Sequence, residues 1–147
     1  RGSWDANTKH KAEFILAMLE AHPRRNIVWV DADAVVRAYP ALFFEMQGDV
    51  GVHYRNGKEL LSGTMFFRNI PRVQALVKSW IKENATAPRE WEQRTLQRLL
   101  VKPWRFGRPR VKVGGLPATY CQIFDLMADA GEPVIEHFQA SREARHG

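Results

Sequence analysis

Two aspartates separated by one alanine directly follow a short apolar segment, and their types and spacing are suited to binding a cation. The segment Ile27–Val30 (IVWV) predicts a buried strand. Asp31 and Asp33 come immediately after it, where the strand opens into a loop. Carboxylates held close together repel each other. A hard divalent ion such as Mg²⁺ or Mn²⁺ removes that repulsion and keeps coordination positions for phosphate oxygens. The alternative interpretation is a strand end with two solvated acids.

Length and composition predict one soluble domain over residues 1–147. The 147 residues are 45% hydrophobic and 26% charged, as in ordinary globular proteins. No apolar run reaches the length of a membrane span. The single cysteine, Cys121, excludes an intramolecular disulfide and suits a reducing compartment. We therefore expect no membrane span and a cytoplasmic location.

The formal charge of +6 favours an anionic partner, such as a phosphate-bearing substrate or a nucleic acid. The densest basic stretch, KPWRFGRPRVK at 102–112, places aromatic residues between cations, which would suit single-stranded nucleic acid. Its two prolines and its glycine favour a surface loop instead. We do not expect nucleic acid as the partner.

The remaining pattern predicts strands and helices in alternation, which is typical of an α/β layered domain. Asn56-Gly57 predicts a hairpin turn behind a strand at 49–54. Pro71 predicts the first turn of a helix, and Pro88 predicts the start of another with Trp91 facing inward. Further helices are expected at 9–21 and 119–130, and further strands at 65–67, 111–113 and 134–135.

Three further motifs accompany the aspartate pair: LSGTMFF at 61–67, WEQRTL at 91–96 and PVIEHFQASR at 133–142. With VDAD at 30–33 before them, this order resembles the GT-A nucleotide-diphospho-sugar transferases, particularly glycosyltransferases of bacteria and their viruses. The likeness runs from Trp4 to about Arg142. It implies a GT-A-like mixed β-sheet flanked by helices. It also implies transfer of a sugar from a nucleotide-diphospho-sugar donor to an acceptor hydroxyl, on a saccharide or another compound.

The resemblance implies a metal site with Mn²⁺ or Mg²⁺ as the cofactor. In the family the two aspartates hold the metal and contact the donor, roles that map onto Asp31 and Asp33, and Asp33 counts among the catalytic residues. A histidine after the last strand often supplies a third ligand, which maps onto His137. Neutral imidazole and two carboxylates suit Mn²⁺. Without the resemblance, His137 would be interpreted as a strand-end histidine bonded to backbone.

The resemblance also implies contacts to the donor and a catalytic base. Small residues of the family lie against the donor sugar, and later residues contact the diphosphate. Glu92 matches an acidic acceptor-side position and would accept the acceptor's proton. An acid in the first turn of a helix is equally favoured by the helix dipole. The expected donor contacts, besides Asp31, are Ser62, Gly63, Thr64, Gln139, Ser141 and Arg142.

The chain departs from the family at its beginning. The strands that hold the nucleoside base in the family precede the aspartate pair, but the residues before Asp31 contain one expected helix and no obvious second strand. The sequence therefore predicts a reduced or truncated N-terminal half. We expect an exposed sheet edge at Ile27–Val30, which a homo-oligomer could cover.

Two rival interpretations remain open. A haloacid-dehalogenase-type phosphotransferase also places two aspartates in this pattern after a buried strand, with Mg²⁺; Ser62 or Thr64 could then bind phosphate. A basic nucleic-acid-binding fragment would use the aromatic and cationic residues of 102–112. It leaves the aspartate pair and His137 unexplained.

Overall fold

Two β-sheets form the centre of the protein in the computed structural model, which describes residues 4–101 and 111–139. A four-stranded sheet has the order β1-β4-β3-β5, and a three-stranded sheet has the order β2-β7-β6. The larger sheet contains β1 (Ile27–Val30), β3 (Val50–Arg55), β4 (Glu59–Phe67) and β5 (Val113–Gly115). The smaller sheet contains β2 (Ala34–Val36), β6 (Gln122–Ile123) and β7 (Ile135–His137).

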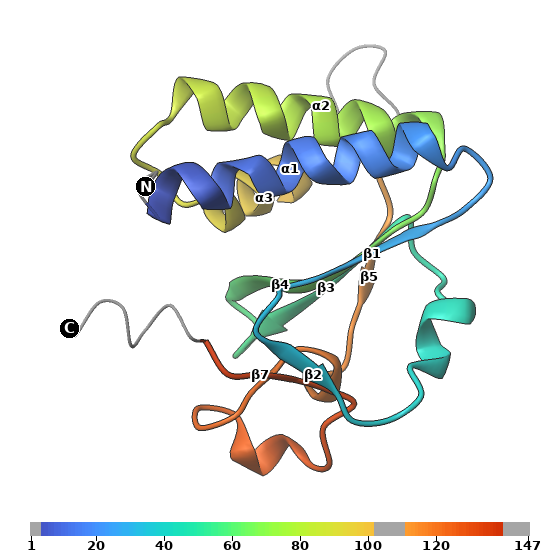
Figure 1. Cartoon of the computed structure of the whole chain (residues 1–147), viewed down its shortest axis with the longest axis vertical. Helices are drawn as coiled ribbons and strands as arrows, with labels where there is room; N and C mark the ends of the chain where they lie inside the picture. Colours follow the sequence, from blue (N-terminus) through green and yellow to red (C-terminus); the bar gives the residue numbers. More distant parts are fainter. Residues whose placement is uncertain (1–3, 102–110, 140–147) are drawn as a thin grey trace.

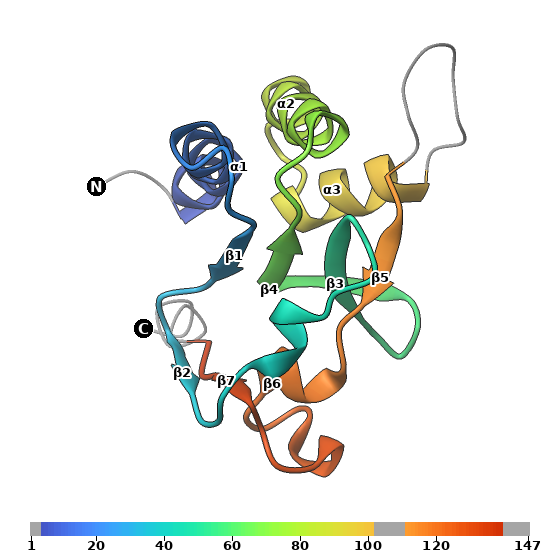
Figure 2. The same cartoon turned by 90° about the vertical axis from the view of Figure 1, so that its right-hand side faces the viewer.

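Three helices lie on one side of the larger sheet, and the smaller sheet lies beyond its other side (Figure 1, Figure 2). The helices are α1 (Trp4–Ala21), α2 (Pro71–Thr86) and α3 (Glu92–Val101). The main core forms where they meet the sheet, around fully buried side chains such as Trp80 of α2 and Phe67 of β4. None of the helices in the described part of the chain has both the length and the apolar character that crossing a bilayer requires.

Several expected elements are present. The strand at 27–30 has the predicted bounds, and the hairpin turn is confirmed by positive φ angles at Asn56 and Gly57. Pro71 occupies the first turn of α2, where the lack of an N–H costs nothing. In α1 the expected apolar positions Ala12, Ile15 and Leu19 are buried.

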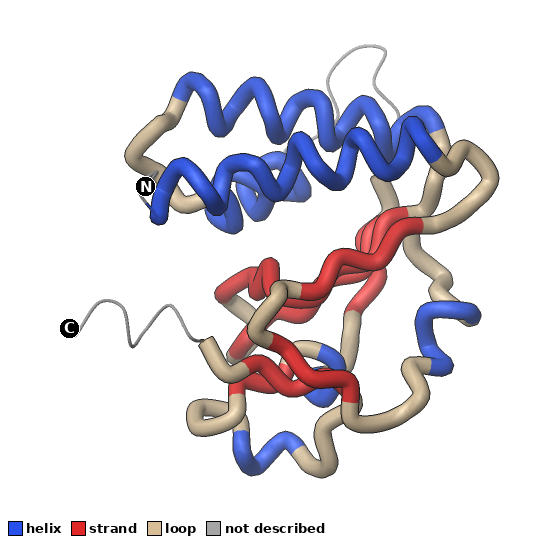
Figure 3. Tube along the Cα trace, viewed as in Figure 1, coloured by secondary structure: helices blue, strands red, loops and turns tan. Residues whose placement is uncertain are grey.

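The helix expected at 119–130 is absent. Its place is taken by two 3₁₀ turns, Ala118–Tyr120 and Ala128–Ala130, with the short strand β6 between them (Figure 3). Four consecutive residues, 120 to 123, are buried. An isolated helix face cannot bury four consecutive side chains, because successive residues point in different directions around its axis.

Other sequence expectations need smaller corrections. Trp91 does not face inward: it is exposed, and α3 begins one residue after it rather than at Pro88. The strand expected at 65–67 begins at Glu59, so residues 62–64 lie within β4 instead of forming a turn before it. The strand expected at 111–113 lies at Val113–Gly115 instead, so Gly114 and Gly115 are part of the strand.

Strand β4 bulges where it carries Ser62, Gly63 and Thr64. Gly51 of β3 pairs with Phe66, whereas His53, two residues later, pairs with Leu61. The extra residues on the β4 side disturb the regular alternation of side chains, as bulges beside functional sites commonly do. Gly63 and Thr64 therefore both contact His137.

Strand β1 lies at one edge of the larger sheet, as the sequence predicts, and pairs only with β4 in that sheet among the described strands. The strand expected to be buried is therefore not buried: its residues are half-buried or exposed, and Val28 is among the exposed large apolar residues, because an edge strand has a neighbour on one side only. The homo-oligomer that could cover this edge stays a prediction.

Candidate metal centre

A tight turn joins β1 to β2 and carries the aspartate pair. The Asp31 N–H donates to the carbonyl of Gly63 at 2.9 Å, which extends the pairing of β1 with β4. The Ala34 N–H then donates back to the carbonyl of Asp31 at 3.1 Å, closing a four-residue turn. The turn passes the chain from the larger sheet to the smaller one and leaves both aspartate side chains half-buried.

The fold brings His137 to this turn. Strand β7 pairs antiparallel with β2, and His137 lies directly opposite Ala34. One possible ligand atom from each of Asp31, Asp33 and His137 lies within 4.8 Å of the other two. It is the only such group of three acidic, histidine or cysteine side chains in the described part of the chain. Two carboxylates and an imidazole within this span are a suitable ligand set for Mn²⁺ or a similar divalent ion.

The structure holds the His137 ring through β4. Nε2 lies 2.7 Å from the hydroxyl oxygen of Thr64, which is fully buried. A Cβ on Gly63 would come within 3.0 Å of the ring atoms Cε1 and Nδ1, so the absence of a side chain at Gly63 makes room for the ring. Burial lowers the pKa of His137, although Asp31 and Asp33 act in the opposite direction. The ring is therefore neutral at pH 7, the form that binds a metal.

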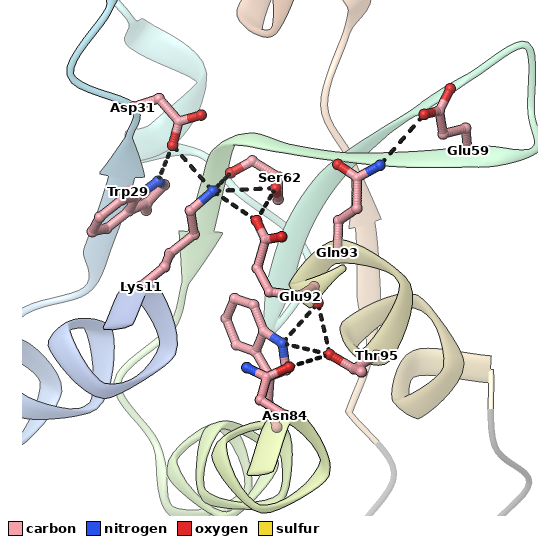
Figure 4. A network of polar contacts seen from close by, with 10 residues as sticks. Lys11, Trp29, Asp31, Glu59, Ser62, Asn84, Glu92, Gln93 and Thr95 are labelled. Atoms are coloured by element: carbon pink, nitrogen blue, oxygen red, sulfur yellow. Dashed lines mark hydrogen bonds and ion pairs between the residues drawn. The ribbon is translucent and has the colours of Figure 1, made fainter. Parts of the chain in front are cut away.

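A buried lysine, which is not among the residues expected from the sequence, forms an ion pair with Asp31. Lys11 of α1 is 7% exposed, and its Nζ lies 3.1 Å from Asp31 Oδ1 and 3.0 Å from Glu92 Oε1 (Figure 4). It also donates to the carbonyl and the hydroxyl oxygen of Ser62, both at 3.2 Å. Burial alone would lower the pKa of Lys11, but Glu92 and Asp31 outweigh it and raise the pKa above its usual value.

The signal for Lys11 is present in the helix pattern. Lys11 lies four residues before Ile15 and eight before Leu19, so it belongs to the buried stripe of α1. A charged residue on an apolar stripe requires a partner. Its partners Ser62 and Glu92 are far away in the sequence, so the pattern alone cannot identify them.

Glu92 lies in a buried network, and its expected role as the base stays a prediction. The residue is 5% exposed, and Oε1 accepts from both Lys11 and Ser62 Oγ, the latter at 2.8 Å. The backbone carbonyl of Glu92 accepts from the indole N–H of Trp80 at 2.8 Å, which ties the start of α3 to α2. The helix dipole and the ammonium of Lys11 both account for an acid at this position.

The residues expected to contact the donor fall into three groups: residues of β4, a residue after β7, and residues outside the described part of the chain. The hydroxyls of Ser62 and Thr64 are buried and bonded within the chain, and Gly63 lies against His137. Gln139 lies two residues after His137 and has a positive φ of 50°. A donor role for these residues stays a prediction. Ser141 and Arg142 lie outside the described residues, as does most of the basic segment 102–112.

Cys121 lies beside Thr64, but it is not part of the candidate metal centre. The group whose possible ligand atoms converge consists of Asp31, Asp33 and His137. Burial raises the pKa of the Cys121 thiol to about 11. Without a metal beside it, this thiol is therefore protonated at neutral pH and is a poor nucleophile.

Comparison with known proteins concerns the family and the fold of the chain. A family model described as nucleotide-diphospho-sugar transferase matches residues 3–142. The structure is similar to a solved glycosyltransferase involved in the glycosylation of the major capsid of PBCV-1, with a TM-score of 0.71 and 16% sequence identity. The match covers 99% of this chain and 78% of that one. At this identity the likeness establishes the fold, which is GT-A-like. A search of curated protein sequences found no significant match.

Proposed function

Since this chain belongs to the nucleotide-diphospho-sugar transferase family, we propose that it is a divalent-metal-dependent glycosyltransferase. It transfers a sugar from a nucleotide-diphospho-sugar donor to an acceptor hydroxyl. The observation that carries the proposal is the convergence of Asp31, Asp33 and His137, whose possible ligand atoms lie within 4.8 Å of one another. Mn²⁺ or Mg²⁺ is the proposed cofactor.

The chemistry of the reaction explains why such a ligand set is useful. The donor loses its sugar as a nucleoside diphosphate departs, so negative charge builds up on phosphate oxygens. A bound divalent cation stabilises that charge as a Lewis acid and orients the leaving group. Asp31 and Asp33 supply negative ligands, and His137 supplies a neutral one held by Thr64 and Gly63.

The ionisable groups around the turn also favour a cation. Asp31, Asp33 and Glu92 contribute three carboxylates, whereas Lys11 contributes one ammonium group. Negative charge is therefore in excess among these four groups. A divalent ion at the three-ligand cluster offsets that excess and lowers the repulsion between the two aspartates of the turn.

Asp33→Asn tests the metal site, because the substitution is nearly isosteric and removes one negative ligand. We expect the fold to persist and the Mn²⁺-dependent binding of UDP or GDP to weaken by at least about 100-fold, more than is lost when a mere partner of a ligand is removed. Isothermal titration calorimetry with Mn²⁺ and with EDTA measures this. Asp129→Asn makes the same chemical change at an exposed residue of a 3₁₀ turn and serves as the control.

Two results would contradict the proposal. If wild type binds UDP or GDP as tightly in EDTA as in Mn²⁺, the metal is not needed for donor binding and the proposal is wrong. A phosphoryl group trapped on Asp31 after incubation with a phosphate ester would instead support the phosphotransferase, because a glycosyltransferase of this kind does not phosphorylate its own aspartate.

A further inference from the structure

We infer that Lys11, Trp29 and Glu92 form a positioning unit that sets the orientation of the Asp31 carboxylate toward the cation. This inference rests on the proposed function, since it assigns residues that act on the metal site without touching the metal. It also gives Glu92 a role other than that of acceptor base.

Asp31 is held by one of its two oxygens. Oδ1 accepts a hydrogen bond from the indole N–H of Trp29 at 2.7 Å and forms an ion pair with Lys11 Nζ at 3.1 Å. One hydrogen bond and one ion pair on the same oxygen restrict the rotation of the carboxylate group. Figure 4 shows the other oxygen pointing away from Trp29 and Lys11. That second oxygen is the one we assign to the cation. Carboxylates that bind metals are in turn held by hydrogen bonds of this kind.

Glu92 holds the lysine in its place. Lys11 Nζ lies between Asp31 and Glu92, and both side chains of the Lys11–Glu92 pair are less than a tenth exposed. A buried ammonium without a carboxylate partner would pay a large desolvation cost. Ser62 completes the arrangement, because its hydroxyl accepts from Lys11 and donates to Glu92 Oε1. The ammonium therefore cannot swing away from Asp31 without breaking several contacts.

The network continues away from the metal site and anchors the unit in the core. The carbonyl of Glu92 accepts from the indole N–H of Trp80, and the single hydroxyl proton of Thr95 lies within reach of both that carbonyl and Oδ1 of Asn84 (Figure 4). Elements α1, α2, α3 and β4 thus all contribute to the position of one carboxylate. Buried networks of this kind rigidify the groups that they connect.

The double variant Lys11→Met/Glu92→Gln separates positioning from charge. It removes one positive and one negative charge, so the net charge of the protein is unchanged. Of the two, Lys11 is the closer to Asp31, so Coulomb's law alone predicts that the variant binds a cation at least as tightly as wild type. If Lys11 and Glu92 position Asp31, the variant should instead bind the cation about 10- to 100-fold more weakly than wild type, as happens when partners that orient metal ligands are removed.

Trp29→Phe is the second variant. It keeps an aromatic ring against Phe14 and beside the Lys11 ammonium, and it removes the donor to Asp31 Oδ1 together with part of the indole ring. We expect about tenfold weaker cation binding, with no change in charge. The matched control is Arg98→Met/Glu90→Gln, which removes an ion pair of 2.6 Å between Arg98 of α3 and Glu90, a residue before that helix, and leaves the net charge unchanged in the same way. We expect its cation affinity to equal that of wild type.

The measurement is a titration of each protein with Mn²⁺ alone, followed by the electron paramagnetic resonance signal of the free ion. Thermal unfolding without metal reports whether each variant is folded. Weaker binding by the folded double variant and by Trp29→Phe, with the control unchanged, supports the inference. If the double variant does not fold, the Mn²⁺ affinity of Trp29→Phe decides the test: weaker binding than wild type supports the inference, and equal binding overturns it.

The results that overturn the inference differ from those that overturn the proposed function. Wild-type Mn²⁺ binding that Asp33→Asn abolishes, but that the folded double variant and Trp29→Phe retain in full, overturns the positioning role alone. It would return Glu92 to the role of base if turnover also falls in Glu92→Gln. A wild-type protein that binds no Mn²⁺ overturns the metal site and the positioning role together.

Discussion

Gly63 lies against the imidazole of His137, and a methyl group there would take space close to the ring. In Gly63→Ala the new Cβ would lie 3.0 Å from ring atoms of His137, so the ring must move by a few tenths of an ångström. The backbone of Gly63 does not have a positive φ, so the effect falls on the ring and not on the strand. We expect Mn²⁺ affinity to fall about tenfold, with little loss of stability.

Gly115→Ala is the control for that substitution. Gly115 also lies in a strand of the larger sheet, and nothing lies within 4 Å of a Cβ added there. Its Mn²⁺ affinity is expected to equal that of wild type in the same titration. Equal affinity of the Gly63→Ala protein would show that the position of His137 does not limit cation binding.

At the residue level, the chemical type of a side chain was easier to anticipate than its partner. Asp31, Asp33 and His137 are residue types that bind metals, and the strand ends on which they lie could be foreseen. The environment of Lys11 could not, because it depends on how α1 packs against β4 and α3. The same packing determines that Glu92 is buried rather than open to an acceptor.

Among the secondary-structure elements, Asp49 connects three segments that position the larger sheet. Its carboxylate accepts two hydrogen bonds from Arg72 of α2, at 2.9 and 2.7 Å, and one from the N–H of Lys112 just before β5, at 2.9 Å. The hydrogen bonds from Arg72 are the main reason that the pKa of Asp49 is lowered. We expect Asp49→Asn to lower the free energy of unfolding by about 1–3 kcal/mol at pH 7.

The effect of Asp49 should depend on pH in a defined direction. A carboxyl group with a lowered pKa in the folded state contributes stability above its unfolded pKa of about 3.9. That contribution is lost as the pH falls through the folded pKa. Urea unfolding of wild type and Asp49→Asn between pH 7 and pH 3 should therefore show a difference that shrinks below about pH 4. If the difference in the free energy of unfolding between the two proteins does not change with pH, the loss of stability comes from altered packing and not from the lost charge.

Periodic elements could be foreseen and irregular ones could not. The apolar stripe of α2 and the run of β1 depend on local sequence, and both elements occur where expected. The segment 119–130 contains enough apolar residues for a helix. It folds instead as 3₁₀ turns around β6, because β6 pairs with β7 from a later part of the chain. The bulge in β4 likewise depends on how β4 pairs with β3. The strand propensities of the residues in β4 do not predict that pairing.

At the scale of the whole molecule, the candidate metal centre joins the two sheets. Asp31 directly follows β1 of the larger sheet, whereas His137 ends β7 of the smaller one. A cation held by both would oppose their separation. At a concentration 100 times its dissociation constant, a ligand stabilises the folded state by about 2.7 kcal/mol. That value corresponds to a roughly 100-fold smaller equilibrium population of the opened structure.

Amide hydrogen exchange measured by mass spectrometry checks this coupling. We expect Mg²⁺ to slow exchange in β2 and β7 more than in α2, which does not border the site. Asp33→Asn should remove the effect. Uniform protection, or none under conditions where Mg²⁺ binding is saturated, would show that the cation does not connect the sheets.

The overall architecture could be anticipated because its motifs occur in the order that the resemblance requires, and the family match covers nearly the same residues. The edge position of β1 could also be foreseen, since no second strand was expected before it. How the two sheets are joined could not be foreseen, because the aspartates of the joining turn indicate a cation and not which strands pair on either side of the turn.

The wide separation of the three ligands along the chain has a consequence for biosynthesis. Asp31 and Asp33 leave the ribosome long before His137, and β7 needs both β2 and β6 as neighbours. A nascent chain that lacks β7 can offer a cation only two carboxylates on a turn. Domains fold as units, with earlier segments available first during synthesis. The helices and the larger sheet can therefore begin to assemble without the metal, and the three-ligand site closes only after β7 has been synthesised.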